Sequence, residues 1–229
     1  MQVAWRRIIA EINKAADYYL LAASGGVDSM FMLAFFLRNC RKPFRVAHFN
    51  HRLRTSADDA EELVRTWCRK NGVPFVVGAG DPDLMRSAES LEAEARRQRF
   101  GFLSAVAENG EMIVTAHHAN DQLETVILRL MRGYPDSNLR MKRISGSRYK
   151  PFLEVPKEEI LHQALTRRLQ WIEDETNTDL AYERNWVRHV LVPQMMERRN
   201  ILKSMVLNER TKSETENEGE PLFSPLGPD

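Results

Sequence analysis

The chain of 229 residues has little cysteine and no long apolar run. Its two cysteines, Cys40 and Cys68, form no Cys-x-x-Cys pair, which argues against a disulfide framework and against a thiolate metal cluster. Because no run of about eighteen apolar residues occurs, we predict no membrane-spanning helix and no membrane partner. The N-terminal residues include acids in a helical pattern, unlike a signal peptide. We therefore expect a cytoplasmic protein.

An excess of charge of one sign is also missing, since the formal net charge is +1. The charges are nevertheless unevenly placed. Residues 208–229 hold six acidic and two basic residues, whereas segment 38–54 holds six basic residues and no acid, and segment 129–150 holds seven and one. Basic loops favour a polyanionic partner, because each neutralised phosphate releases counterions. An ordinary solvated surface is the alternative. We expect residues 206–229 to form an acidic, disordered tail.

What the sequence does contain is a regular alternation of short β-type runs and helical stretches. The expected strands cover residues 18–23, 44–49, 74–77 and 112–116, and the expected helices cover 3–12, 28–39, 56–71, 89–109 and 120–132. Such units predict an α/β fold with a parallel sheet between two layers of helices. Further along we expect a polar basic loop (134–150), a helix (156–168), a strand end with a loop (171–179) and a last helix (182–199).

Ligands of such sheets bind at the carboxyl ends of the strands, where the strand order reverses. Three polar sequences follow expected strands there, namely SGGVDS (24–29), HFNHRLR (48–54) and AHHANDQLET (116–125). The third places Asp121 and Glu124 on one face at the start of a helix. Their charge suits Mg²⁺ or a substrate ammonium, and compensation of the helix dipole is the alternative.

The first of these sequences has the chemistry of a phosphate cradle. Gly25 and Gly26 allow positive φ angles and close approach of a ligand, and the following helix N-terminus attracts an anion. Ser24 and Ser29 add hydroxyl donors, although the lysine of a Walker A loop is absent. A glycine turn before a helix capped by Asp28 is the alternative reading.

The complete string SGGVDS resembles the SGGxDS signature of the PP-loop ATP pyrophosphatases, which cleave ATP to AMP and pyrophosphate. Five further strings resemble, in order, segments of the tRNA(Ile)-lysidine synthetases within that superfamily. They are HFNHRLR, ESLEAEARRQRFGFL, TAHHANDQLETVILRLMRG, KPFLEVPKEEI and WIEDETNTDLAYERNWVRHVLVPQM. The resemblance implies an α/β, doubly wound, parallel five-stranded sheet in a PP-loop domain (1–150), followed by a short helical extension (151–205).

The resemblance also implies a reaction. ATP adenylates the wobble cytidine of an isoleucine tRNA with a CAU anticodon, and the ε-amine of L-lysine then displaces AMP. The implied ligands are ATP, Mg²⁺, L-lysine and tRNA, and a homodimer is a further expectation. Another PP-loop enzyme, such as a tRNA thiolase, and a catalytically silent paralogue that binds nucleotide or tRNA are the alternatives. The lack of a Cys-x-x-Cys pair argues against the thiolase.

Carried over residue by residue, the resemblance assigns candidate roles. ATP would be bound by Ser24, Gly25, Gly26, Val27, Asp28, Ser29, Asn50, His51 and His117. The expected catalytic residues are Asp28, Asp121, Glu124 and Arg96, with Asp121 and Glu124 binding lysine and Asp28 anchoring Mg²⁺. The expected tRNA contacts are Arg52, Arg54, Arg140, Lys142, Arg143, Arg184 and Arg188. Structural alternatives stand beside them: a satisfied histidine at 117, an ion pair between Glu92 and Arg96, and tertiary pairing of segment 174–177 with segment 184–189.

Three departures weaken the assignment of substrate more than that of ATP. The family's glycine-rich RGTGLDGLxGM segment is replaced by RGYPDSNLRMKRI (132–144). Asn120 stands where the family has the first aspartate of a pair, so more weight falls on Asp121. The sequence also ends before the C-terminal RNA-binding domains of many relatives, which leaves a minimal enzyme and a fragment as the two readings.

Overall fold

The computed structural model describes residues 5–53, 56–88, 90–173, 178–199 and 201–202. Arg54, segment 174–177 and the expected acidic tail lie outside these residues. The strands are β1 (Tyr18–Ala22), β2 (Phe44–Asn50), β3 (Phe75–Ala79), β4 (Glu111–Val114), β5 (Ile144–Ser145) and β6 (Arg148–Tyr149). The helices are α1 (Trp5–Ile12), α2 (Val27–Asn39), α3 (Ser56–Asn71), α4 (Pro82–Ser87), α5 (Leu91–Val106), α6 (Ala119–Met131), η1 (Asp136–Asn138), α7 (Lys157–Thr166), α8 (Glu183–Trp186), η3 (Val187–Leu191) and α9 (Val192–Arg198).

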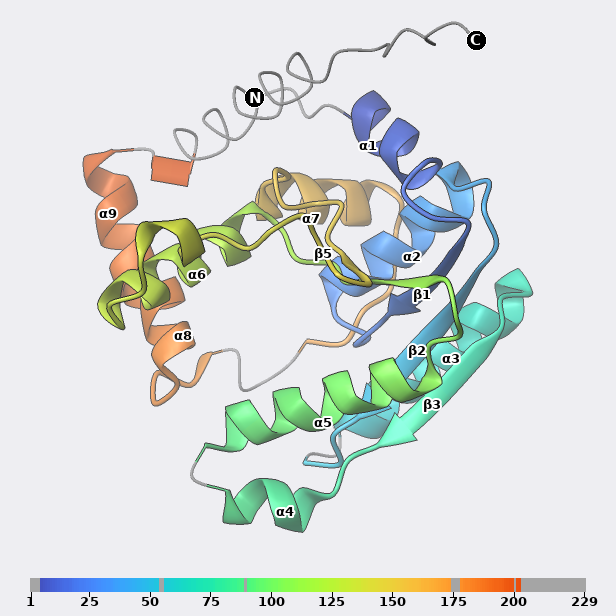
Figure 1. Cartoon of the computed structure of the whole chain (residues 1–229), viewed down its shortest axis with the longest axis horizontal. Coiled ribbons are helices and arrows are strands. Elements are labelled where there is room, and N and C mark those ends of the chain that lie inside the picture. Colours follow the sequence, from blue (N-terminus) through green and yellow to red (C-terminus); the bar gives the residue numbers. More distant parts are fainter. Residues whose placement is uncertain (1–4, 54–55, 89, 174–177, 200, 203–229) are drawn as a thin grey trace, which may run out of the picture.

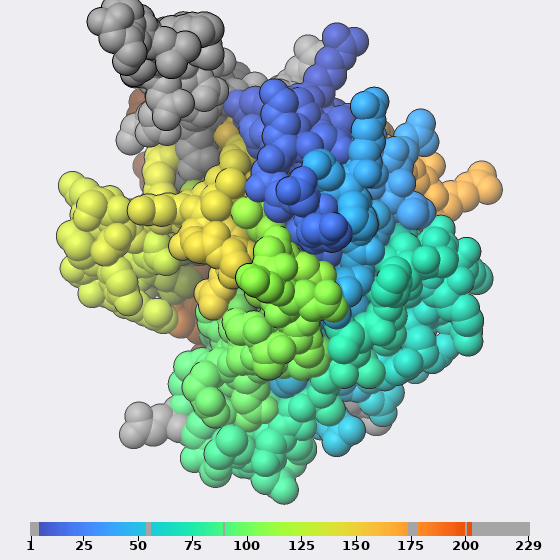
Figure 2. Space-filling model, turned by 45° about the vertical axis from the view of Figure 1, so that its right-hand side comes forward, coloured from blue at the N-terminus to red at the C-terminus, as the bar shows by residue number. Residues whose placement is uncertain are grey.

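The strands form one sheet in the order β3-β2-β1-β4-β6-β5. All neighbouring strands are parallel except β5, which runs antiparallel to β6. The α/β class and the parallel sheet are therefore confirmed, whereas the count of five strands is wrong. Strands β5 and β6 lie in the segment that we expected to be a loop. The sequence did not indicate them, because two residues each are too few to show an alternating pattern. Figure 2 shows this segment in yellow beside the green region of β4.

Each face of the sheet is covered by helices, which gives three layers (Figure 1). Along β1, Tyr19 and Leu21 point into the larger core under α1, α2 and α7, while Leu20 points into a second cluster under α5. This alternation follows from the two-residue period of a strand, and burial of both faces explains why β1 is apolar throughout. No helix in the described residues is long and apolar enough to cross a bilayer.

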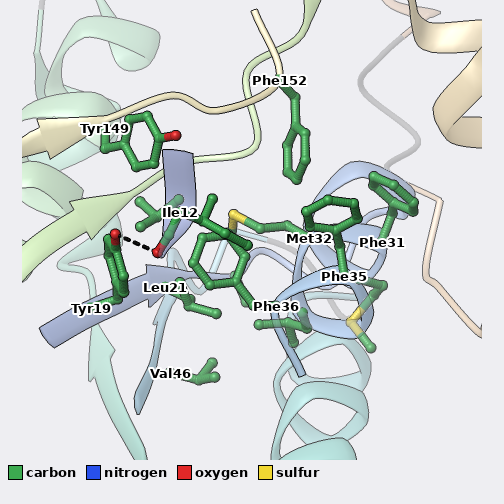
Figure 3. Close-up of a cluster of buried hydrophobic side chains, with 14 of the residues drawn as sticks. Ile12, Tyr19, Leu21, Phe31, Met32, Phe35, Phe36, Val46, Tyr149 and Phe152 are labelled. Atoms are coloured by element: carbon green, nitrogen blue, oxygen red, sulfur yellow. Dashed lines mark hydrogen bonds between the residues drawn. The ribbon is translucent and has the colours of Figure 1, made fainter. Parts of the chain in front are cut away.

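The larger core is rich in aromatic rings (Figure 3). Phe31 and Phe35 of α2 pack against Phe152 with ring centroids 5.5 and 5.3 Å apart. Tyr19 is fully buried, and its hydroxyl donates to the Ile12 carbonyl at 2.8 Å. Burial raises the pKa of Tyr19 to about 12, so the ring stays neutral and anchors the end of α1 to the sheet.

Two helical regions differ from expectation. The helix expected over 89–109 is the unbroken α5, and α4 is an additional short helix before it. The Oγ atom of Ser90 caps α5 by accepting from the Ala93 N–H at 3.3 Å. The helix expected over 182–199 is split into α8, the π-helical turn η3 and α9. Together with α6, η3 and α9 bury a smaller apolar cluster that includes Leu123, Ile127 and Val187.

The bend between β1 and α2 depends on one of its two glycines. Gly25 has a φ angle of +86°, and a Cβ atom there would lie 2.8 Å from the Cβ of Ala60 on α3. Gly26 has a φ angle of −75°, which any residue adopts, and a Cβ there would meet only Ser24 Oγ at 3.6 Å. Of the two glycines that allow a positive φ, only Gly25 adopts one, and the fold itself gives no reason for glycine at position 26.

We predict that Gly25→Ala lowers the free energy of unfolding by roughly 2–4 kcal/mol, because it combines a left-handed backbone with a clash against α3. Gly26→Ala is the matched control and should change stability by less than about 1 kcal/mol. Urea unfolding of the two variants measures both values. Equal losses in the two variants would contradict this account of the bend.

Candidate active site

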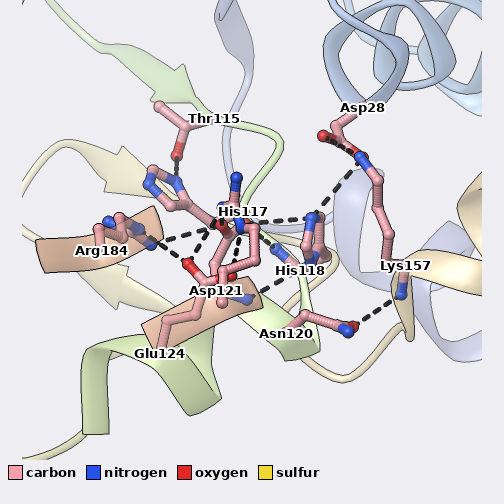
Figure 4. A network of polar contacts seen from close by, with 10 residues as sticks. Asp28, Thr115, His117, His118, Asn120, Asp121, Glu124, Lys157 and Arg184 are labelled. Carbon is pink, nitrogen blue, oxygen red and sulfur yellow. Dashed lines mark hydrogen bonds and ion pairs between the residues drawn. The ribbon is translucent and has the colours of Figure 1, made fainter. Parts of the chain in front are cut away.

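The candidate site lies where the strand order reverses, at the carboxyl ends of β1 and β4. These strands pair directly, with Leu21 opposite Val114, so the bend after β1 and the polar segment after β4 leave the sheet side by side. Asp28 of the first segment and His118 and Asp121 of the second meet there in one polar network (Figure 4).

Ser29 shapes the bend from inside. Its Oγ atom accepts from the backbone N–H groups of Ser24 and Gly25, both at 3.1 Å, and donates to the Gly26 carbonyl at 2.9 Å. The hydroxyl of this buried serine is thus used by the loop, unlike the free phosphate donor expected from the sequence. The donors left for an anion are the N–H groups of the first turn of α2, at Val27 and Asp28, which have no intrahelical acceptor.

Lys157 is the residue that sequence reasoning missed. Its Nζ atom lies 2.6 Å from both carboxylate oxygens of Asp28, although the two residues are far apart in the sequence. Both side chains are about one third exposed. The lysine that the bend itself lacks is therefore supplied by the N-terminus of α7. Lys157 lies within KPFLEVPKEEI, one of the strings that carry the family resemblance.

Residues at the start of α6 connect this ion pair to the rest of the site. His118 caps α6. Its ring atom Nδ1 accepts from the backbone N–H of Asp121 at 3.4 Å, and the backbone N–H of His118 donates to Asp121 Oδ2 at 3.0 Å. The other ring nitrogen, Nε2, lies 3.7 Å from Asp28. Asn120 Oδ1 accepts from the Lys157 N–H at 2.9 Å. Asn120 thus helps to position α7. An amide oxygen suffices for this contact, so the aspartate that the family has at this position is not required.

Two titratable side chains after β4, those of Asp121 and His117, have strongly shifted pKa values. Burial would raise the pKa of Asp121, but the neighbouring histidines and Arg184 hold it well below its ordinary value. Burial lowers the pKa of His117 to about 4, and Thr115 Oγ1 lies 2.8 Å from its Nδ1 atom. At neutral pH the site therefore contains an ionised Asp121 beside a neutral His117.

Glu124 lies one turn further along α6 and is buried with two arginines. Its carboxylate accepts from Arg184 Nε at 2.8 Å and from Arg188 Nε at 2.7 Å. Arg184 and Arg188 thus face inward onto α6, which differs from the RNA contact expected of them. Segment 174–177, the pairing partner that the sequence suggests for these arginines, lies outside the described residues. Their described partner is Glu124 of α6. Asp121 also contacts both arginines, with its Oδ1 atom 3.4 Å from Arg184 Nη2 and 3.7 Å from Arg188 Nη2. These contacts are longer than those of Glu124, so Asp121 is the less tightly paired carboxylate of the two.

The exit of β2 differs from expectation. Asn50 is buried, donates to Asp58 at 2.8 Å and Glu61 at 3.1 Å, and accepts from the Arg52 N–H at 2.9 Å. Its amide shapes the turn and is not directed at a ligand. His51 stacks edge-on against Phe49. Arg52 is exposed, with a φ angle of +55°.

The basic segment 134–143 is held against α6. Gln122 accepts from the Met141 N–H at 2.8 Å and donates to its carbonyl at 2.9 Å. Arg143, expected to contact tRNA, instead turns inward, where it pairs with the buried Glu154 and with Glu11 at 2.9 Å. Its guanidinium is used by the core and is not offered to RNA.

The other two basic residues expected on this segment differ in exposure. Lys142 is exposed, and Arg140 is partly exposed.

Arg96 forms no ion pair with Glu92 in the described part of the chain. Its guanidinium lies over the Phe100 ring, 4.9 Å from the centroid. Burial lowers its pKa, as do the positive charges of Arg184 and Arg148. The charge of Glu92 acts in the opposite direction, although the two side chains form no ion pair.

The donor set for Mg²⁺ is small. Among the described residues no group of three or more acidic, histidine or cysteine side chains could hold a metal ion. Mg²⁺ is commonly bound by one or two carboxylates together with substrate phosphates and water. Asp28, at the N-terminus of α2, fits an ion that arrives with a nucleotide, provided that its oxygens exchange Lys157 for the metal.

Known proteins resemble the chain over most of its length. The chain is 36% identical over 197 residues to the bifunctional protein TilS/HprT of Listeria monocytogenes, covering 80% of this chain and 30% of that protein. It is 33% identical over 184 residues to the tRNA(Ile)-lysidine synthase of Haemophilus ducreyi, covering 78% of this chain and 42% of that enzyme. The chain thus spans less than half the length of these two relatives.

A solved structure extends the likeness to the fold. The U34-tRNA thiolase NcsA of Methanococcus maripaludis superposes with a TM-score of 0.70 at 13% identity, over 98% of this chain and 82% of that one. The PP-loop domain family matches residues 1–195, which include the bend, the β4 exit and α7. The chain therefore belongs to the PP-loop domain family.

Proposed function

We propose that the protein ligates L-lysine to the wobble cytidine of an isoleucine tRNA, using ATP and releasing AMP and pyrophosphate. The observation that carries the proposal is the direct pairing of β1 with β4, which brings an anion-binding bend beside an ionised carboxylate. Relatives named tRNA(Ile)-lysidine synthase support the choice of reaction. A homodimer stays a prediction.

The bend is the proposed site for the phosphates of ATP. The positive φ of Gly25, the N-terminus of α2 and the absence of a side chain at Gly26 leave backbone donors open to an anion. Lys157 adds a cation at the same point. In the ligand-free arrangement this lysine neutralises Asp28. When ATP binds, it would turn to the phosphates, which frees Asp28 for Mg²⁺, an ion that would neutralise phosphate charge.

The β4 exit is the proposed site for lysine. An amine substrate is cationic at neutral pH and needs an ionised carboxylate, and Asp121 keeps that charge because its pKa is low. His117 is neutral and so does not repel the substrate. The pairs of Glu124 with Arg184 and Arg188 hold α6, which carries Asp121, against α8 and η3.

In the proposed sequence, the cytidine carbonyl oxygen attacks the α-phosphate of ATP and pyrophosphate leaves toward the bend. The ε-ammonium of lysine then loses a proton to solvent, and the free amine attacks the adenylated ring carbon. The carbon–oxygen bond to AMP breaks, and the second proton of the new C–N group also passes to solvent. Asp121 is an orienting group here rather than a base, because a carboxylate with a low pKa takes up a proton poorly near pH 7.

The thiolase alternative is not favoured. The NcsA structure that shares the fold carries a [4Fe-4S] cluster. In this chain Cys68 is buried in the larger core and Cys40 lies at the C-terminal end of α2. Burial raises the pKa of both thiols, so neither is suited to hold a cluster or to act as a thiolate nucleophile.

We predict that AMP release requires both tRNA and lysine, and that Asp121→Asn lowers kcat/KM for lysine at least about 100-fold by removing the charge that holds the amine. An AMP-release assay over a range of lysine concentrations measures this. Asp136→Asn, which removes an exposed acid on η1, is the matched control and should leave the rate unchanged. AMP release that is equally fast without lysine would refute lysine as the nucleophile.

We also predict that Lys157→Gln weakens ATP binding at least about tenfold, because it removes a cation from the proposed phosphate site. The free energy of unfolding should change by less than about 1 kcal/mol, since the ion pair with Asp28 is partly exposed. Lys157→Arg should restore most of the affinity. Isothermal titration with ATP and Mg²⁺ tests this, and unchanged ATP affinity in Lys157→Gln would remove the lysine from the site.

A further inference from the structure

Three arginines that form no ion pair among the described residues surround one aromatic ring beside the candidate site. The guanidinium carbons of Arg96, Arg99 and Arg148 lie 4.9, 5.2 and 4.3 Å from the centroid of the Phe100 ring. Arg96, Arg99 and Phe100 belong to α5, whereas Arg148 belongs to β6. We call these four residues the Phe100 arginine cluster.

Arg99 and Arg148 are half-buried, and arginines in such positions usually have acidic partners. None of the three arginines forms an ion pair with an acid in the described part of the chain, in contrast to Arg184 of α8 and Arg188 of η3. Burial, together with the charges of Arg96 and Arg184, lowers the pKa of Arg99 to about 10. The arrangement therefore costs folding free energy, which is characteristic of a site that awaits a ligand.

Two more cations continue the cluster toward the basic segment. Arg129 of α6 and Lys150 after β6 add positive charge to the same region, and the pKa of Lys150 is lowered by burial and then by Arg148 and Arg96. Arg129 Nη1 donates to the carbonyls of Asn138 and Arg140, and Lys150 Nζ donates to the carbonyl of Lys142. The cluster is thus continuous with segment 129–150, where seven residues are basic and one is acidic.

We propose that the Phe100 arginine cluster, bordered by Arg129 and Lys150, binds backbone phosphates of the RNA substrate. A guanidinium stacked on a ring keeps its N–H edge free, and that edge matches the two oxygens of a phosphate. A continuous basic strip suits a chain of phosphates better than it suits one nucleotide. The proposal rests on the proposed function for the identity of the RNA.

The cluster is separate from the ATP cradle. The cradle is formed at the N-terminus of α2 after β1, whereas the cluster is formed by α5 and β6. β6 lies two places from β1 in the sheet, beyond β4. The positive charges of Arg99 and Lys150 reach His117, so the cluster borders the site without contributing to the bend. RNA held there would lie beside Asp121.

The test measures binding of a labelled anticodon stem-loop with a CAU anticodon to the full chain over a series of salt concentrations. We expect Arg99→Gln and Arg148→Gln each to weaken RNA binding at least about fivefold and to reduce the salt slope by about 1. ATP affinity should stay within about twofold. The melting temperature should not fall, since each change relieves repulsion. Arg69→Gln, at an exposed position on α3, is the matched control and should change none of these.

Other outcomes overturn the proposal. Unchanged RNA affinity and salt slope would remove the cluster from the RNA site, and so would absence of RNA binding by the wild-type chain. Loss of ATP affinity instead of RNA affinity would assign the cluster to the nucleotide. Failure of the proposed function is distinguishable, because RNA binding through the cluster without lysine-dependent AMP release would refute the reaction and leave this site standing.

Discussion

The parallel pairing of β1 with β4 is the constraint on which the site depends. Consecutive strands β1, β2 and β3 extend the sheet in one direction, and β4 returns to the opposite side of β1. Two loops then leave adjacent strands, at the edge where ligands of parallel sheets bind. The residues at that edge differ in charge: backbone donors and Lys157 lie after β1, and the carboxylate of Asp121 lies after β4.

Ion pairs of different exposure have different roles at this edge of the sheet. In the pairs of Glu124 with Arg184 and Arg188 the carboxylate is buried, and breaking the pairs would leave its charge without a partner in the interior, so they fix α6 against α8 and η3. The pair of Asp28 with Lys157 is more exposed and can exchange partners at lower cost. The rigid pairs therefore preserve the geometry while the exposed pair can respond to a ligand.

The sequence was sufficient for features that arise from short-range patterns. The helix expected over 56–71 coincides with α3, because its apolar spacing and its ends are local properties. The bend at 24–29 and the β4 exit could likewise be placed, since turn residues after apolar strands mark the ligand edge. Helix ends and glycine positions carry their signal within a few residues.

Long-range partnerships could not be predicted in this way. Nothing near Asp28 indicates that its partner is Lys157, and nothing near Glu124 indicates that two arginines from a later helix will bury it. The direction in which Arg143 points depends on Glu154 and Glu11, which come from different parts of the chain. Charge patterns along a sequence show where cations are frequent, but burial decides which of them face solvent.

The packing of Phe152, Val155 and Ile160 has a consequence for how the molecule unfolds. These three residues belong to the same core as Tyr19 and Phe31, and the Ile172 N–H donates to the Gly25 carbonyl at 3.0 Å. The described residues 151–172 therefore share a core with the strands of the first half of the chain and should unfold together with them. Slow amide exchange in α7 should accompany slow exchange in β1, because opening either one exposes the same interior.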